Sequence, residues 1–130
     1  MRFGIHTLDD ADVRGKTVLC RVDINQPVDK SSGTLGSTAR IEACVPTVRE
    51  LSDKGARVVL LAHQGSDIEY KNFYTTRPHA DVLSHLLGRC VRFVEDVCGP
   101  AAREAVASLS DGEILLLDNV RFCSEEQTLF

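Results

Sequence analysis

The sequence has no long apolar run. Its longest uninterrupted apolar stretch, Val58 to Ala62, has five residues, whereas a membrane-spanning helix needs about 18. The first ten residues, MRFGIHTLDD, contain no apolar segment of the kind that secretory signals carry, and they become acidic at once. We therefore expect a cytoplasmic protein that binds no membrane.

The chain also lacks an excess of positive charge. Its 15 lysines and arginines are outnumbered by 19 aspartates and glutamates, which gives a formal net charge of −4. A general nucleic-acid-binding protein needs a basic face that neutralises phosphates, so we expect no nucleic-acid partner. Arginine nevertheless makes up 11 of the 15 cations, and its planar guanidinium is well suited to carboxylates and phosphates. The composition therefore still allows a local anion site.

Metal-binding and disulfide patterns are missing as well. The odd number of cysteines and the absence of any Cys-x-x-Cys pair support neither a zinc site nor a disulfide framework. We expect the cysteines to be small, buried or half-buried apolar residues in a reducing compartment. They are Cys20, Cys44, Cys90, Cys98 and Cys123. His79 and His85 lie six residues apart on a predicted helix, a spacing that places them on different faces, so we expect no metal there.

No glycine-rich phosphate loop follows a predicted strand. The dinucleotide pattern Gly-x-Gly-x-x-Gly is absent. Gly15-Lys16-Thr17 resembles the end of a Walker A loop, but Asp10 stands where the first glycine of that loop belongs. The triplet also precedes a predicted strand instead of following one. We therefore expect that the chain does not bind ATP through such a loop.

What the sequence does contain is a regular alternation of strand-like and helix-like segments. Apolar or β-branched runs predict strands over Lys16–Ile24, Arg57–Ala62, Val91–Val94 and Glu113–Leu117. Helical spacing of apolar residues predicts helices over Thr38–Lys54, between Thr76 and Gly88, and over Ala101–Leu109. This order implies right-handed crossovers and a parallel sheet. The predicted fold class is α/β, a three-layer Rossmann-like domain with helices on both faces of the sheet.

Two of the predicted helices carry more specific expectations. Pro46 interrupts the first one and predicts either a kink or a fresh helix that begins near it. In the second helix, Thr76 is the expected N-cap and Gly88 the expected stop. The buried stripe of this second helix is expected to consist of Val82, Leu83, Leu86 and Leu87.

Polar side chains follow each predicted strand. A strand that leaves a core often ends in polar residues simply because it has reached water, but four such ends favour a shared site, since the carboxyl ends of parallel strands lie along one edge. In the first strand, side-chain alternation would point Arg21, Asp23 and Asn25 away from Val22 and Ile24. The other candidates are His63, Arg121 and Asn119 at strand ends and Arg40 at the start of a helix. This set predicts a pocket for a small anion that also has hydroxyl groups.

These motifs together resemble a known family. The match is to the amino-terminal domain of phosphoglycerate kinase, with the motifs in the same order and at similar spacing from about Leu8 to Glu126. The residues themselves are most similar to those of the archaeal branch. The match is carried by RVDIN (Arg21 to Asn25), ARI (Ala39 to Ile41) with Pro46-Thr47, LAHQG (Leu61 to Gly65), FVEDVCGPAAREAV (Phe93 to Val106) and DNVRF (Asp118 to Phe122).

The resemblance implies a glycolytic kinase that moves a phosphoryl group between 1,3-bisphosphoglycerate and ADP. It implies that this domain binds 3-phosphoglycerate or 1,3-bisphosphoglycerate, and that Mg-ATP or Mg-ADP binds to a second domain and not to this chain. By the same resemblance Arg40 lies beside the transferred phosphoryl group, and Arg21 borders the same basic patch, so these two arginines are the implied catalytic residues. The implied substrate-binding residues are Asp23 and Asn25 at the glycerate, Arg40, His63 in the basic patch, and Arg121 at the substrate's own phosphate.

The chain departs from the family pattern in three places. Ser66 and Asp67 follow His-x-Gly, where the family usually has an arginine, and Asp118 replaces a glutamate. The sequence also stops at Phe130, before a nucleotide-binding domain, so we expect residues 1–130 to be a partial amino-terminal substrate-binding domain that is inactive alone.

Two alternatives to a kinase domain stay open. A non-catalytic small-anion-binding module derived from the same fold is favoured by Ser66. A receiver-type signalling domain of similar length is disfavoured, because the acidic pair Asp9-Asp10 precedes the first strand instead of following it.

Overall fold

The computed structural model describes residues 4, 7–25, 38–63 and 75–120. A short 3-10 helix, η1 (Leu8–Asp10), precedes β1 (Thr17–Arg21). Helices and strands then alternate as α1 (Ala39–Asp53), β2 (Arg57–Leu61), α2 (Arg77–Leu87), β3 (Val91–Val94), α3 (Pro100–Ala107) and β4 (Ile114–Leu117). The strands form one parallel sheet in the order β1-β2-β4-β3.

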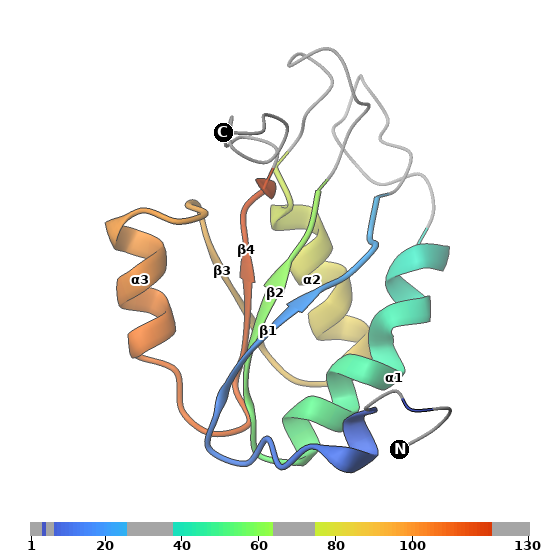
Figure 1. Cartoon of the computed structure of the whole chain (residues 1–130). Helices are drawn as coiled ribbons and strands as arrows, with labels where there is room; N and C mark the ends of the chain where they lie inside the picture. Colours follow the sequence, from blue (N-terminus) through green and yellow to red (C-terminus); the bar gives the residue numbers. More distant parts are fainter. Residues whose placement is uncertain (1–3, 5–6, 26–37, 64–74, 121–130) are drawn as a thin grey trace.

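Helices cover both faces of this sheet, with α1 and α2 on one side and α3 on the other (Figure 1). Successive side chains of β2 and β4 therefore enter different cores. Val58, Leu60, Ile114 and Leu116 belong to the core that includes α1 and α2, while a second core joins Val59, Leu115 and Leu117 to α3. The expected three-layer α/β fold is confirmed.

The α3 face of the sheet is covered over only part of its width. An open apolar groove of about 520 Å³ lies between α3 and the strands β1 and β2, with Leu19, Val59 and Leu61 on its strand side. Leu19 is 65% exposed.

None of the described helices is long and apolar enough to cross a bilayer.

α1 runs through Pro46 without interruption, so the expected fresh helix start there is wrong. Proline removes one N–H from the helix and leaves the carbonyl four residues earlier, that of Glu42, without its usual donor. Both Pro46 and Glu42 are exposed, so water can hydrogen-bond that carbonyl. The alternative expectation, a kink at Pro46, stays a prediction.

The ends of α2 agree with the sequence, but its buried stripe does not. Thr76 occupies the N-cap position, and Gly88 ends the helix in the left-handed conformation, at φ 68°. The buried residues are His79, Ala80, Leu83 and Leu87, whereas the expected Val82 and Leu86 are half-buried. Val82 and Leu86 pack at the margin of the core. The stripe is therefore rotated, and a histidine lies on its buried side.

The cysteines divide into two groups. Cys20 and Cys44 are half-buried as expected, and burial raises the pKa of both thiols, that of Cys44 to about 11, which keeps them protonated and unreactive. Cys90 and Cys98 are exposed, so the expectation of burial was wrong for them. Each lies in a turn beside β3, outside the apolar runs that form the cores. Cys123 lies outside the described residues.

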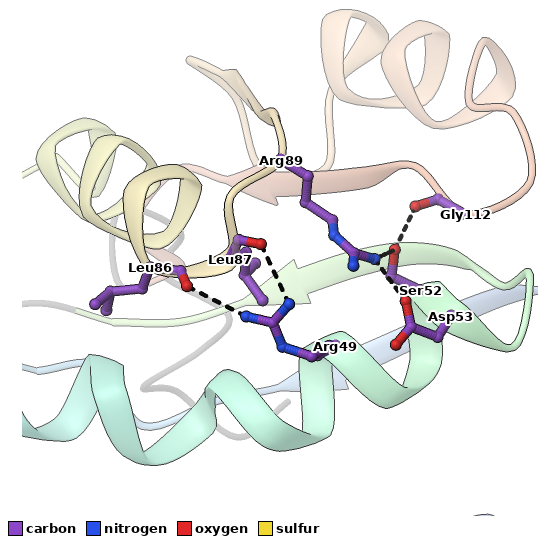
Figure 2. Close-up of polar contacts among 7 residues, drawn as sticks. All are labelled: Arg49, Ser52, Asp53, Leu86, Leu87, Arg89 and Gly112. Atoms are coloured by element: carbon purple, nitrogen blue, oxygen red, sulfur yellow. Dashed lines mark hydrogen bonds and ion pairs between the residues drawn. The ribbon is translucent and has the colours of Figure 1, made fainter.

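A polar network ties α1 to the turn after α2 and to the residues before β4 (Figure 2). Arg49 donates to the carbonyls of Leu86 and Leu87 at 3.2 and 3.3 Å. Arg89 donates to Ser52 Oγ at 2.8 Å and to Asp53 Oδ1 at 2.9 Å. Ser52 Oγ in turn donates to the Gly112 carbonyl at 2.7 Å. The network lies where β3 and β4 begin, at the amino edge of the sheet.

We expect Arg49→Met to lower the free energy of unfolding by about 1 to 2 kcal/mol, because it removes two charge-assisted hydrogen bonds to the carboxyl end of α2 and keeps most of the aliphatic stem. Urea unfolding measures this loss. Arg103→Met, at an exposed position on α3, is the control and should change stability by less than about 0.5 kcal/mol. Equal losses in both variants would contradict a capping role for Arg49.

Candidate anion-binding site

The carboxyl ends of all four strands lie along one edge of the sheet because every neighbouring pair is parallel. This is the upper edge in Figure 1, and α1 and α2 begin there. Arg21 ends β1, His63 lies just past β2, and Glu95 directly follows β3. The expectation that the polar strand ends share an edge is confirmed for Arg21 and His63, and Glu95 lies at the end of the outer strand β3. Arg121 lies outside the described residues.

Asp23 and Arg40 meet at this edge. Asp23 follows the end of β1, and Arg40 lies in the first turn of α1. Arg40 Nη1 donates to Asp23 Oδ1 at 3.5 Å, and the two side chains remain 56% and 69% exposed, respectively. An ion pair this exposed contributes little to stability. Its consequence is positional: the guanidinium is held beside the end of β1 with most of its donors open to solvent.

Asn25 and His63 form the second contact at the edge. Asn25 Nδ2 and His63 Nε2 are 3.4 Å apart, and both residues are half-buried. Because an amide nitrogen only donates, this contact requires Nε2 of the imidazole to accept. The backbone N–H of Asn25 also donates to Asp23 Oδ1 at 3.4 Å. The two contacts are therefore adjacent, and they join the segments that follow β1 and β2 to each other and to α1.

Arg21 adds a further cation at this edge. It is the last residue of β1, and its side chain is exposed. Val22 and Ile24 are buried while Asp23 is exposed, so the alternation expected from the sequence continues past the end of the strand. The first strand itself is shorter than expected, although the Val22 N–H still donates to the Leu61 carbonyl at 2.9 Å.

Four buried polar residues lie behind the exposed ones, and the sequence indicated a role for only two of the four, Asn119 as a site candidate and Thr76 as an N-cap. They are Thr76, His79, Asp118 and Asn119, none more than 4% exposed. Burial lowers the pKa of His79 to about 4, so its imidazole is neutral near pH 7. For His79 the sequence does indicate burial, because His79 lies four residues before Leu83 and so falls on the buried stripe of the helix.

The edge therefore combines guanidinium groups, an imidazole, an amide and a carboxylate. Guanidinium groups bind phosphate or carboxylate oxygens, and the amide and carboxylate suit hydroxyl groups. No group of three or more metal-ligating residues occurs within the described ranges. Together, the fold and the edge define an α/β domain with a cluster of polar side chains at the carboxyl ends of a parallel sheet, and this cluster is the candidate small-anion site.

Known proteins with this arrangement are found by sequence and by structure. The sequence pattern of the phosphoglycerate kinase family matches residues 8–129. Phosphoglycerate kinase of Methanothermobacter thermautotrophicus is 52% identical over 124 residues, which cover 95% of this chain and 30% of the relative. That of Saccharolobus solfataricus is 48% identical over 122 residues, or 94% and 29% of the two chains.

The solved structures agree. The crystal structure of phosphoglycerate kinase from Pyrococcus horikoshii matches with a TM-score of 0.88 at 41% identity, over 95% of this chain and 30% of that chain. This chain therefore belongs to the phosphoglycerate kinase family, and the resemblance to archaeal members is confirmed. It spans about 30% of the length of the relatives it matches.

Proposed function

We propose that this chain is the 3-phosphoglycerate-binding part of a phosphoglycerate kinase, an enzyme that transfers a phosphoryl group between ATP and the carboxylate of 3-phosphoglycerate in the cytoplasm. The observation that carries the proposal is the pair of adjacent contacts at the carboxyl edge, Asp23 with Arg40 and Asn25 with His63. In this proposal residues 1–130 are part of the amino-terminal domain. Mg-ATP or Mg-ADP binds to a second domain.

The proposed substrate roles are those that the family resemblance implies, and the chemistry of each group suits them. Asp23 accepts a hydrogen bond from the glycerate hydroxyl, and Asn25 with His63 binds the glycerate portion. Arg121, outside the described residues, binds the phosphate of the substrate. Arg40 and Arg21 face the carboxyl end that receives the phosphoryl group, where a guanidinium stabilises the charge that develops during transfer. The protein mainly positions groups and stabilises charge in such a reaction.

Binding measurements test the proposal. Calorimetric titration of this chain should show weak, saturable binding of 3-phosphoglycerate and no measurable binding of MgATP, and a coupled assay should detect no ADP release. In-line transfer needs both substrates held together, and the expected nucleotide site belongs to another domain. Tight MgATP binding or turnover by this chain would contradict the proposed division of roles.

A second candidate, a non-catalytic small-anion-binding module, is favoured by the sequence at Ser66 and Asp67, which lie outside the described residues. A serine donates one neutral hydrogen bond, whereas an arginine offers a charge-assisted contact to phosphate. We expect Ser66→Arg to tighten 3-phosphoglycerate binding by about five- to thirtyfold, and Ser66→Arg with Asp67→Asn to tighten it further. Both gains should shrink as salt is raised. Unchanged affinity at low and high salt would favour the second candidate.

A further inference from the structure

The buried polar residues behind the site form one connected set of hydrogen bonds. Asp118, the first residue after β4, is 4% exposed. Its Oδ1 accepts from Thr75 Oγ1 at 2.9 Å, from the Thr76 N–H at 3.1 Å and from the Asn119 N–H at 2.8 Å. Thr76 Oγ1 donates to the Leu117 carbonyl at 2.8 Å. The end of β4 is thus bonded to the start of α2, across more than 40 positions of the sequence.

These contacts anchor the amino-terminal end of α2 to the end of β4. Thr76 holds the N-cap position, but its own side chain makes no capping bond and is used on Leu117 instead. Asp118 Oδ1 accepts the N–H of the N-cap residue Thr76, while Thr75 Oγ1, itself bonded to Asp118, accepts the Arg77 N–H at 3.3 Å. The positive end of the helix dipole favours the negative charge of Asp118. Oδ1 of this buried carboxylate is satisfied by its three donors.

The same set reaches the strands that carry the candidate site. The imidazole of His79, fully buried on α2, hydrogen-bonds the backbone of Ile24, the residue between Asp23 and Asn25. On the other side, the Val120 N–H donates to the Ala62 carbonyl at 2.9 Å, directly before His63. The Asp118 N–H also donates to the Asp96 carbonyl, just past β3, at 3.1 Å. The ends of all four strands are therefore joined through buried bonds.

We propose that Asp118, Thr76 and His79 form a positioning brace for the anion site, which sets the distance between the end of β1, with Asp23 and Asn25, and the end of β2, with His63. The proposal rests on the function proposed above. The three brace residues are buried and do not touch the ligand. Instead, they hold the exposed groups in the arrangement that binds it, and small displacements of such groups reduce binding strongly.

The test measures 3-phosphoglycerate affinity on folded variants. Asp118→Ala removes the shared acceptor and should weaken affinity by about tenfold or more, whereas Asp118→Asn, which keeps an acceptor oxygen in the same place, should lose about threefold or less. Thr76→Val removes only the bond to Leu117 and should give an intermediate loss. It also serves as the test if Asp118→Ala does not fold.

The matched control is Ser52→Ala. Ser52 is also buried, and its hydroxyl also joins two elements, but at the amino edge of the sheet. It should lower stability and leave affinity within about twofold. If Asp118→Ala and Thr76→Val bind as the wild type does, or if Ser52→Ala loses affinity equally, the brace is a general stability element and the proposal is wrong.

A ligand-free measurement separates this proposal from the proposed function. Backbone amide chemical shifts of Asp23, Asn25 and His63 should change in Asp118→Ala and Thr76→Val and stay constant in Ser52→Ala. If the wild type does not bind 3-phosphoglycerate, the proposed function fails, and these shifts still test the brace. Unchanged amide shifts at Asp23, Asn25 and His63 in both brace variants would overturn it.

Discussion

Replacing Arg40 with alanine is expected to lower kcat by about 100-fold or more, with a much smaller change in KM for 3-phosphoglycerate. In the proposed function this guanidinium meets charge that develops only in the transition state, so its loss should affect the rate more than substrate binding. The measurement uses a chimera in which this chain replaces the corresponding 30% of the Methanothermobacter relative. Because the Arg40–Asp23 pair is more than half exposed, its loss should change stability by less than about 1 kcal/mol.

Arg121→Ala in the same chimera provides the contrast. This arginine is proposed to bind the phosphate that the substrate already carries, so its removal should raise KM far more than it lowers kcat. Arg103→Ala, at an exposed position on α3, should change neither parameter. If the Arg40 and Arg121 variants show the same fall in kcat and the same rise in KM, the two arginines do not have the separate roles proposed for them.

The stability of this protein should fall as the pH is lowered from about 6.5 to about 4, and His79 should account for a large part of the fall. Burial lowers the pKa of His79 from 6.5 to about 4. Between these values the unfolded chain binds a proton that the folded chain does not bind, so protonation favours unfolding. A pKa difference of this size lowers the free energy of unfolding by about 3 kcal/mol at pH 4 and leaves it unchanged above about pH 6.5.

Urea unfolding at a series of pH values measures this effect. His79→Gln removes the titrating group, so the variant should lose less stability than the wild type between pH 7 and pH 4. His85→Gln is the matched control, since His85 lies on the same helix and is exposed. Its pH dependence should equal that of the wild type. A wild-type slope in His79→Gln would show that His79 does not titrate as its burial predicts.

The order of the elements and the parallel sheet were predictable because they depend on local patterns. The run ILLL before Asp118 and the glycine after α2 need no knowledge of distant residues. The same patterns placed Arg21 and His63 at one edge, because right-handed crossovers between parallel strands leave all carboxyl ends on the same side.

The remaining features depend on contacts between distant positions. Asn25 and His63 are 38 residues apart, and Thr76 and Asp118 are 42 apart, so no local pattern pairs them. His79 was considered only as a metal ligand, although its position on the apolar stripe indicates burial. The packing of α2 against both the sheet and α1 decided which of its apolar residues were covered. α1 also continues through Pro46, where Pro46 and Glu42 are both exposed.

The central claim is that the carboxyl edge binds 3-phosphoglycerate, and amide chemical-shift mapping of this chain tests it most directly. Titration with 3-phosphoglycerate should produce saturable shift changes at Asp23, Asn25, Arg40 and His63, while MgATP should produce none there. Residues at the amino edge, such as Ser52 and Gly112, should not respond. Saturable changes at the amino edge or in the apolar groove beside Leu19, with none at the carboxyl edge, would contradict the claim.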